Sequence, residues 1–360
     1  MRAGPWRRGW RDGGTARRGT ARRGTARRGT ARRGTARRGR TAVDPRHLLL
    51  ALGILWIVDG ALQLQPAMFT RWFVTGVLVP SAAGSPHFVA GPIVSTAHLL
   101  EAHVALWNAL FASIQLLIGA GILVRRTVRP ALALSIVWSL AVWWLGEGLG
   151  GLFTGSASPL TGAPGSVLLY ALAALVLWPP RDAPSPAGSA AWPPRDAPSP
   201  ARFAAGGLLG DRGARLAWAM LWLGSAALLC QPANLVPGAL RTTLTGAAAG
   251  EPGWLSRIVS QLARAVRPDS TAVVIALAVV MAAVGAGVAL RWGEPALLAL
   301  AIVLAMGIWM FGEAFGGVLT GSGTDPNTGP LLVLLALALY PARADKTVGE
   351  VVPAVSGVGA

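Results

Sequence analysis

The sequence predicts an all-α integral membrane protein with eight transmembrane helices, arranged as two parallel four-helix repeats. Hydrophobic residues make up 53% of the chain and charged residues 13%, and the mean hydropathy of +0.53 exceeds the soluble range. The motif W-x-x-G-E-x-x-G-G-x-x-T-G-S occurs at 143–156 and again at 309–322. Each copy ends a long apolar run, which indicates an internal duplication.

Four apolar runs divide the first half of the chain. They lie at 48–64, 104–124, 130–153 and 164–178. A transmembrane helix needs about 20 apolar residues (range ~17–25), so the first three runs are long enough and the fourth is short. The segment 67–97 has mixed composition with several Gly and Pro residues, and it is expected to form an interfacial loop.

The second half repeats the first at a constant offset of 166 residues. The matches include Gln65-Pro66 with Gln231-Pro232, Gly119 with Gly285, and Arg125 with Arg291. Gly, Pro and Trp are seldom interchangeable, so a register without gaps over such positions indicates tandem duplication. The predicted repeats cover 43–178 and 214–341.

The basic excess of the chain belongs to a tail. The net charge is +17, but residues 1–40 hold fifteen Arg and one Asp, mostly in a Thr-Ala-Arg-Arg-Gly repeat. The repeat has no apolar periodicity, so 1–42 is predicted to be disordered, as are the Pro-rich linker 179–213 and the tail 342–360. The Arg repeat either contacts anionic lipid, binds nucleic acid, or is not translated, with the true start near Val43. No specific nucleic-acid partner is expected of the folded part.

Arginine placement orients the predicted helices. Basic residues follow the second, fourth, sixth and eighth runs: Arg125, Arg126, Arg129, Arg181, Arg195, Arg291, Arg343 and Lys346. The positive-inside rule therefore places both termini in the cytoplasm and the chain in the plasma membrane. Four spans in each repeat make the repeats parallel, related by an axis along the membrane normal. The loop 233–270 carries four Arg and argues weakly against this topology.

Each motif places a glutamate near the outer edge of the membrane. Glu147 lies 17 residues after Pro130, roughly 25 Å along a helix in a ~30 Å hydrocarbon core, and Glu313 falls at the same level. Either each glutamate bonds locally while the motif glycines allow close helix contact, or both contact a ligand or ion at an outer mouth. The glycines with this packing role are Gly146, Gly150, Gly151, Gly312, Gly316 and Gly317.

A polar stripe occurs in the first half only. Glu101, Asn108 and Gln115 recur by seven residues with small residues between them, so they share one helical face. A small, polar face is expected to point into the protein. The counterparts of the two amides at the 166-residue offset are Val274 and Met281, so the second half has lost its deeper polar groups.

Asp59 is the acid expected deepest in the membrane. It lies 11 residues past Leu48, and Ser225 takes its place in the second half. A carboxylate in hydrocarbon is costly unless it is neutralised or paired, and Asn108 and Gln115 are the predicted partners. A satisfied bond between helices, a proton- or cation-coupled role, and exposure to a cavity all remain open.

The remaining polar residues predict neither a metal site nor an enzyme. His87, His98, Glu101 and His103 raise the possibility of a metal site, and His98 and Glu101 are one turn apart. His103 faces elsewhere, His47 is expected on the opposite side of the membrane, and the second half has no counterparts, so interfacial histidines are favoured over a metal site. Cys230 lies in an apolar run and is expected to be buried. Hydrolase, kinase and dinucleotide motifs do not occur, so no catalytic residue or cofactor is assigned.

The last span of each half is short, at about 164–178 and 330–340. Short segments at equivalent positions of two repeats point to a transport site, although a half-inserted loop without a transport role has the same pattern. We therefore expect a small solute or cation to pass along Asp59, Glu101, Asn108 and Gln115. Glu147 and Glu313 then lie at the outer mouth of this path.

The four-span unit, whose first run ends at Gln65-Pro66, resembles DoxX-like small membrane proteins, here twice in tandem. The W-x-x-G-E-x-x-G-G motif is similar to one found in uncharacterised actinobacterial membrane proteins, which supplies no function. The DoxX-like resemblance implies a non-catalytic accessory or scaffold subunit with a membrane redox partner and no cofactor motif of its own. This is the alternative to the solute hypothesis.

Overall fold

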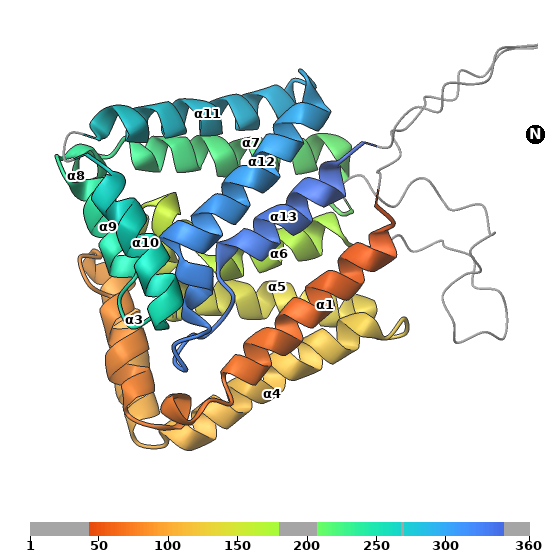
Figure 1. The fold of residues 1–360 in the computed structure, drawn as a ribbon. Helices are drawn as coiled ribbons and strands as arrows, with labels where there is room; N and C mark the ends of the chain where they lie inside the picture. The colour runs from red at the N-terminus through yellow and green to blue at the C-terminus, as the bar shows by residue number, and fades with distance from the viewer. Residues whose placement is uncertain (1–42, 180–206, 268–269, 342–360) are drawn as a thin grey trace, which may run out of the picture. The chain divides into compact units, whose positions relative to one another are not determined.

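The structure is a computed structural model that describes residues 43–179, 207–267 and 270–341. All regular elements in these ranges are helices (Figure 1). The predicted tails 1–42 and 342–360 and most of the linker lie outside the described residues. The helix α7 starts at Gly210, four residues before the predicted bound at 214.

Each half contains α-helices, 3₁₀-helices and one π-helix among the described residues. The first half contains α1 (Pro45–Leu62), η1 (Pro66–Phe69), the π-helix η2 (Phe73–Leu78), α2 (Val79–Ser81), α3 (His87–Glu101), α4 (Val104–Leu123), α5 (Val128–Leu145), η3 (Gly148–Gly151), η4 (Pro159–Thr161) and α6 (Ser166–Val176). The second half contains α7 (Gly210–Leu229), α8 (Pro232–Leu235), α9 (Ala239–Ala247), α10 (Gly253–Ala265), α11 (Thr271–Ala289), α12 (Glu294–Gly307), η5 (Ile308–Gly312), η6 (Ala314–Gly317) and α13 (Thr328–Leu339).

Five helices of the described residues are long and apolar enough to cross a membrane. They are Pro45–Leu62, Val104–Leu123, Val128–Leu145, Thr271–Ala289 and Glu294–Gly312. The chain is therefore a membrane protein by the length and composition of its helices. Of the other three predicted spans, α7 carries Asp211, Arg212 and Arg215 near its start, whereas α6 and α13 are apolar but only 11 and 12 residues long.

The short helix α6 is extended by a non-helical segment. Eleven residues rise only about 16 Å, less than a ~30 Å hydrocarbon core. Beyond α6 the chain continues through 177–179, and the Arg129 guanidinium donates to the Pro179 carbonyl at 3.1 Å. The segment that ends α6 therefore reaches back to the start of α5.

The segments 67–97 and 233–267 were expected to be loops, but the structure makes both mostly helical. In α3 the buried residues Val89, Ile93 and Ala97 follow one another by four, which is the period of one helix face. Leu255 and Val259 begin the same pattern in α10. The mixed composition of these segments reflects one apolar and one polar face rather than loop structure.

Corresponding helices of the two halves pack in the same order. α1 contacts α4, α4 contacts α5 and α5 contacts α6, while α7 contacts α11, α11 contacts α12 and α12 contacts α13. The halves meet where α6 packs against α13, and α1 also contacts α13 while α7 contacts α6. One hydrophobic core runs through both halves, with Trp56, Tyr170 and Trp218 among its fully buried side chains.

Helix α4 buries its two amide side chains and exposes large apolar side chains on the opposite face. Asn108, Ala112 and Gln115 are buried, as the periodicity predicts, whereas Leu106 and Leu117 on the opposite face are 69% and 66% exposed. Extensive exposed apolar surface of this kind is typical of contact with lipid. The pattern agrees with a helix whose outer face contacts the bilayer.

Charged side chains join the start of α7 to its neighbours. Arg215 donates to Asp211 at 3.1 Å and to Glu294 of α12 at 2.5 Å, and it also bonds the Val288 carbonyl of α11. Asp211 pairs in addition with Arg291. At the other end of α7, Cys230 is exposed, contrary to the prediction, because it lies at the helix terminus instead of inside the apolar run.

Candidate functional site: a polar cavity beside the first motif

Both motifs stop a helix with a run of left-handed residues. After α5, the φ angles of Gly148 to Gly151 lie between 55° and 69°, and after η5 those of Ala314 to Gly317 lie between 44° and 75°. A Cβ at Gly150 would overlap the Pro164 carbonyl oxygen. The glycines are therefore required by backbone conformation and by close approach of the following loop.

The glycine spacing does not form the helix-packing face that the sequence predicts. Gly146 is the residue that ends α5, so Gly146 and Gly150 are not on one continuous helix. The same holds in the second half, where Gly316 lies in the left-handed run and approaches the Asp325 carbonyl. The spacing reflects a helix end followed by a tight turn.

Each motif glutamate caps the short helix that follows. Glu147 Oε1 accepts from Ser166 Oγ at 2.7 Å and from the Val167 amide at 3.3 Å, at the start of α6. Glu313 accepts from the Thr328 amide at 3.1 Å and from the Thr328 hydroxyl, at the start of α13. The helix N-terminus supplies free N–H groups and a partial positive charge for a carboxylate.

The motif tryptophans hold the same loops. The indole N–H of Trp143 donates to the Pro164 carbonyl, and that of Trp309 donates to the Pro326 carbonyl, both at 2.6 Å. The closing turns also agree, because Thr154 donates to the Gly151 carbonyl and Thr320 donates to the Gly317 carbonyl. The two motifs thus have the same local structure, although the loops after them differ in length.

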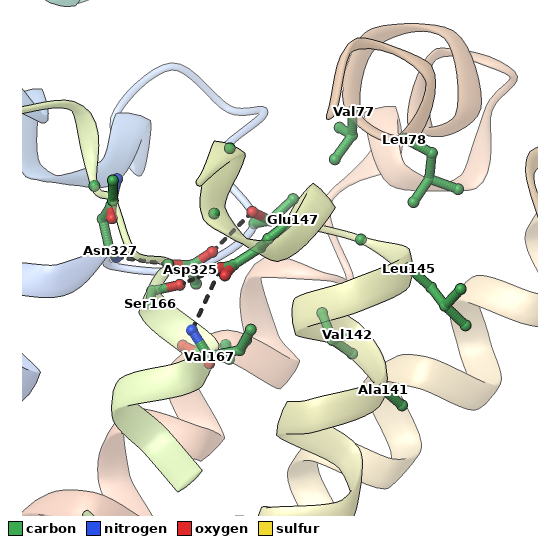
Figure 2. A pocket seen from close by; sticks show the side chains of 18 of the residues that line it. Val77, Leu78, Ala141, Val142, Leu145, Glu147, Ser166, Val167, Asp325 and Asn327 are labelled. Atoms are coloured by element: carbon green, nitrogen blue, oxygen red, sulfur yellow. Dashed lines mark hydrogen bonds between the residues drawn. The ribbon is translucent and has the colours of Figure 1, made fainter. Parts of the chain in front are cut away.

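A cavity of about 550 Å³ lies beside the first motif. Most of its lining comes from the first half, including α1, η2, α4, α5 and the loop before α6, and the loop 324–327 of the second half completes it. Figure 2 shows Glu147, Ser166, Asp325 and Asn327 gathered on one side, while Leu78 and Leu145 lie away from them. The volume is within the range of small-molecule sites, ~300–1,000 Å³.

Three carboxyl groups line this cavity: Asp59, Glu147 and Asp325. Asp59 is 1% exposed and accepts a hydrogen bond from the Tyr170 hydroxyl at 2.8 Å. Its observed partner is therefore Tyr170 of α6, and the predicted amide partners were wrong. Asp325 accepts from the Asn327 amide at 2.7 Å and from the Thr324 hydroxyl at 3.0 Å.

Several buried polar atoms of the lining have no hydrogen-bond partner. They are Gln63 Oε1, Gln115 Oε1, Glu147 Oε2 and Trp138 Nε1. Gln63 and Gln115 are 7% and 6% exposed, so bulk water does not reach them freely. Unpaired buried polar groups cost ~1–3 kcal/mol each, which favours a bound molecule or water in this space.

Burial raises the pKa of both capping glutamates. Burial and the nearby Asp325 carboxylate raise the pKa of Glu147 to about 8, against the lowering effect of its hydrogen bonds from Ser166 and Val167. Burial likewise raises the pKa of Glu313 to about 7, although its bonds from Thr328 lower it. Both groups lie beyond the ends of the spanning helices, and both can exchange a proton near neutral pH.

The corresponding place in the second half is nearly closed. A cavity of about 20 Å³ lies there, which holds about one water molecule. Its lining includes Ser225, Met281 and Ile308, which match Asp59, Gln115 and Val142 of the large cavity at the 166-residue offset. It also includes Thr328 and Leu332, which match Ser166 and Tyr170 when the starts of α13 and α6 are aligned. The loss of acid and amide thus coincides with the loss of volume.

The structure brings together only part of the predicted path. Asp59, Gln115 and Glu147 line the large cavity, whereas Glu101, Asn108 and Glu313 do not. Glu101 ends α3 and is not part of α4, because the helix breaks at 102–103. Asn108 is buried and donates to the Gln63 carbonyl at 2.7 Å.

Sequence reasoning missed Asp325 and Gln63. At the constant offset of 166 residues Asp325 pairs with Pro159, but the loop before α13 is four residues shorter than the loop before α6. Matching Pro326 with Pro164 instead makes Asp325, in the loop after the second motif, the counterpart of Ala163. Only the packing of the two halves brings it to the cavity.

The described residues contain no group of three or more His, Cys, Asp or Glu side chains placed to hold a metal ion. His98 lies 3.7 Å from Glu101, and both side chains are largely exposed. Comparison with models of protein families, with curated proteins and with solved structures gives no match. The chemistry of the cavity is therefore the basis for a functional proposal.

Proposed function

We propose that this chain is a multi-pass membrane protein that binds a small solute or cation in the cavity of its first half and moves it across the membrane. Asp59, Gln115 and Glu147 form the site, joined by Gln63 and by Asp325 from the second half. The protein acts without a cofactor of its own. The second half supports the site and has no working cavity.

One observation carries this proposal: the large cavity beside the first motif is lined by acids and amides, whereas its counterpart beside the second motif is nearly closed. The first has a volume of about 550 Å³ and the second about 20 Å³. Polar groups inside a membrane protein are expensive and mark substrate or ion pathways. A purely structural role for Asp59 requires only its bond to Tyr170 and leaves the neighbouring unpartnered amides without a reason.

We further propose an arrangement of eight spans in two parallel repeats in the plasma membrane. The matching structure of the two motifs and the matching order of helix contacts support it. In this arrangement α6 and α13 complete each repeat as short spans, and both termini are cytoplasmic. The Arg repeat within 1–42 then faces the anionic leaflet and contacts its lipids.

Some predicted path residues receive other roles. Asn108 holds the Gln63 backbone and so positions the Gln63 side chain at the cavity. Glu313 caps α13 and has no cavity of comparable size beside it. Glu101 lies outside the proposed site because its side chain is exposed at the end of α3.

A pair of matched cysteine variants tests access to the cavity. Val142 lines the large cavity and Ile308 is its counterpart at the small one. In a Cys230→Ser background, which removes the single native thiol, Val142→Cys and Ile308→Cys are exposed to N-ethylmaleimide and modification is followed by mass spectrometry. We expect Val142→Cys to react at least ten times faster.

Absence of reactivity at Val142→Cys would show that the first half is packed dry, and equal reactivity at the two positions would show that the cavity of the first half is no more accessible than its counterpart; either result would refute the proposal. In that case the redox-accessory alternative becomes testable in the same preparation. A chain that co-purifies with quinone or with an oxidoreductase, and does not transport solutes in liposomes, would support the accessory function in place of the solute function.

A further inference from the structure

The lining of the large cavity carries acidic groups without a basic partner. Asp59, Glu147 and Asp325 contribute carboxyls, and among the described residues that line it there is no Lys, Arg or His. Asp325 lies close enough to Glu147 for the two to interact electrostatically. Neighbouring carboxylates repel each other unless a proton or a bound cation compensates their charge.

The unpartnered atoms add to this preference. Three of them are oxygen acceptors, Gln63 Oε1, Gln115 Oε1 and Glu147 Oε2, whereas Trp138 Nε1 is the one unpartnered donor of the lining. Both glutamines are more than nine-tenths buried. A ligand that donates hydrogen bonds or carries positive charge satisfies these oxygens, and an anion does not.

Another part of the lining is aromatic and apolar. Phe111 lies 6.3 Å from Phe73 and 5.5 Å from Trp138 between ring centroids, and all three rings line the cavity. Aromatic faces attract cations and also cover apolar groups. The cavity therefore combines acids with an aromatic wall.

A bare metal ion does not suit this arrangement. A divalent cation needs several oxygen ligands at ~2.0–2.6 Å, and no three His, Cys, Asp or Glu side chains in the described part of the chain are placed to hold one. A volume of about 550 Å³ also far exceeds the space of one ion. The size and the aromatic wall favour a larger guest.

We propose that the cavity binds an organic cation, an onium group on an apolar body, with its charge beside Glu147 and Asp325 and its apolar part against Phe73, Phe111 and Trp138. The inference rests on the proposed function, because it names the solute class of the same site. Both halves of the chain then determine which ligand binds, because Asp325 belongs to the second half and the other acids belong to the first.

Two ions of the same shape and opposite charge test the proposal. Purified full-length protein in detergent is titrated with tetraphenylphosphonium and, separately, with tetraphenylborate. We expect saturable binding of the cation at least tenfold tighter than binding of the anion. This comparison uses the unaltered protein, so it does not depend on whether a variant folds.

Variants then locate the site. At pH 9, where Glu147 is mostly ionised, Glu147→Gln and Asp325→Asn are each expected to weaken tetraphenylphosphonium binding at least fivefold, because they remove charge at the cavity. Glu313→Gln is the matched control, since Glu313 caps α13 in the same way but lies outside the cavity lining; its binding is expected to stay within twofold. Size-exclusion chromatography establishes that each variant is folded.

Binding of tetraphenylborate as tight as that of the cation, or equal losses in Glu147→Gln and Glu313→Gln, would overturn the organic-cation inference. Absence of saturable tetraphenylphosphonium binding would overturn it as well. If Val142→Cys nevertheless reacts much faster than Ile308→Cys, the solute cavity stands and only the ligand class is wrong. If Val142→Cys does not react, the proposed function fails with it.

Discussion

Raising the pH from 7 to 9 is expected to tighten binding of an organic cation about tenfold, through ionisation of Glu147. Burial and Asp325 raise the pKa of this carboxyl to about 8. A group with that pKa is about one-tenth ionised at pH 7 and about nine-tenths ionised at pH 9. Protonation and cation binding compete for the same carboxyl, so the apparent affinity follows the ionised fraction. Asp325, Asp59 and Tyr170 are the other titratable groups that interact with Glu147.

Equilibrium dialysis of tetraphenylphosphonium at pH 7, 8 and 9 measures this dependence. The unaltered protein is expected to gain affinity steadily over this range. Glu147→Gln removes the titrating group and is expected to abolish most of the gain, whereas Glu313→Gln retains it. A profile that is flat in the unaltered protein, or equally steep in Glu147→Gln, would show that Glu147 does not control the site.

Three stability predictions follow from the fold, each measured by thermal unfolding in detergent. Gly150→Ala is expected to cost at least ~2 kcal/mol, because a Cβ meets the following loop at positive φ, whereas Gly155→Ala, with open space around it, costs only ~1 kcal/mol; equal losses would contradict the contact argument. Arg215→Ala is expected to cost ~1.5–3 kcal/mol, because it leaves the partly buried Glu294 without this partner, and a neutral effect would refute that role. Ser135→Ala is expected to cost ~1–2 kcal/mol, because it removes the acceptor of the buried indole N–H of Trp56, and an unchanged midpoint would show that the bond is replaceable.

The apolar runs predict the long helices well but not the amphipathic ones. A helix such as α11 (Thr271–Ala289) is apolar on all sides after its first residue, so its length and composition alone identify it. In α10 the buried residues recur with the period of one helix face, while Arg257 and Arg264 are exposed. The mean hydropathy of the whole segment hides that pattern. Pro92 inside α3 further argues against a helix when only the local sequence is considered.

The candidate site was only partly predictable because it depends on tertiary contacts. Asp59 and Gln115 stand out as polar residues in apolar runs, and Glu147 stands out through its repeated motif. Asp325 reaches the cavity only because the loop before α13 packs against the loop before α6, where the side chain of Asn327 approaches Gly162. No periodicity within one half predicts a contact made by the other half.

Protection of Val142→Cys by a bound cation tests the central claim most directly. The variant is prepared in the Cys230→Ser background, and its rate of modification by N-ethylmaleimide is measured with and without saturating tetraphenylphosphonium. We predict rapid modification that the cation slows at least fivefold, while tetraphenylborate has no effect. A rate that neither ion changes would show that no organic cation occupies this cavity.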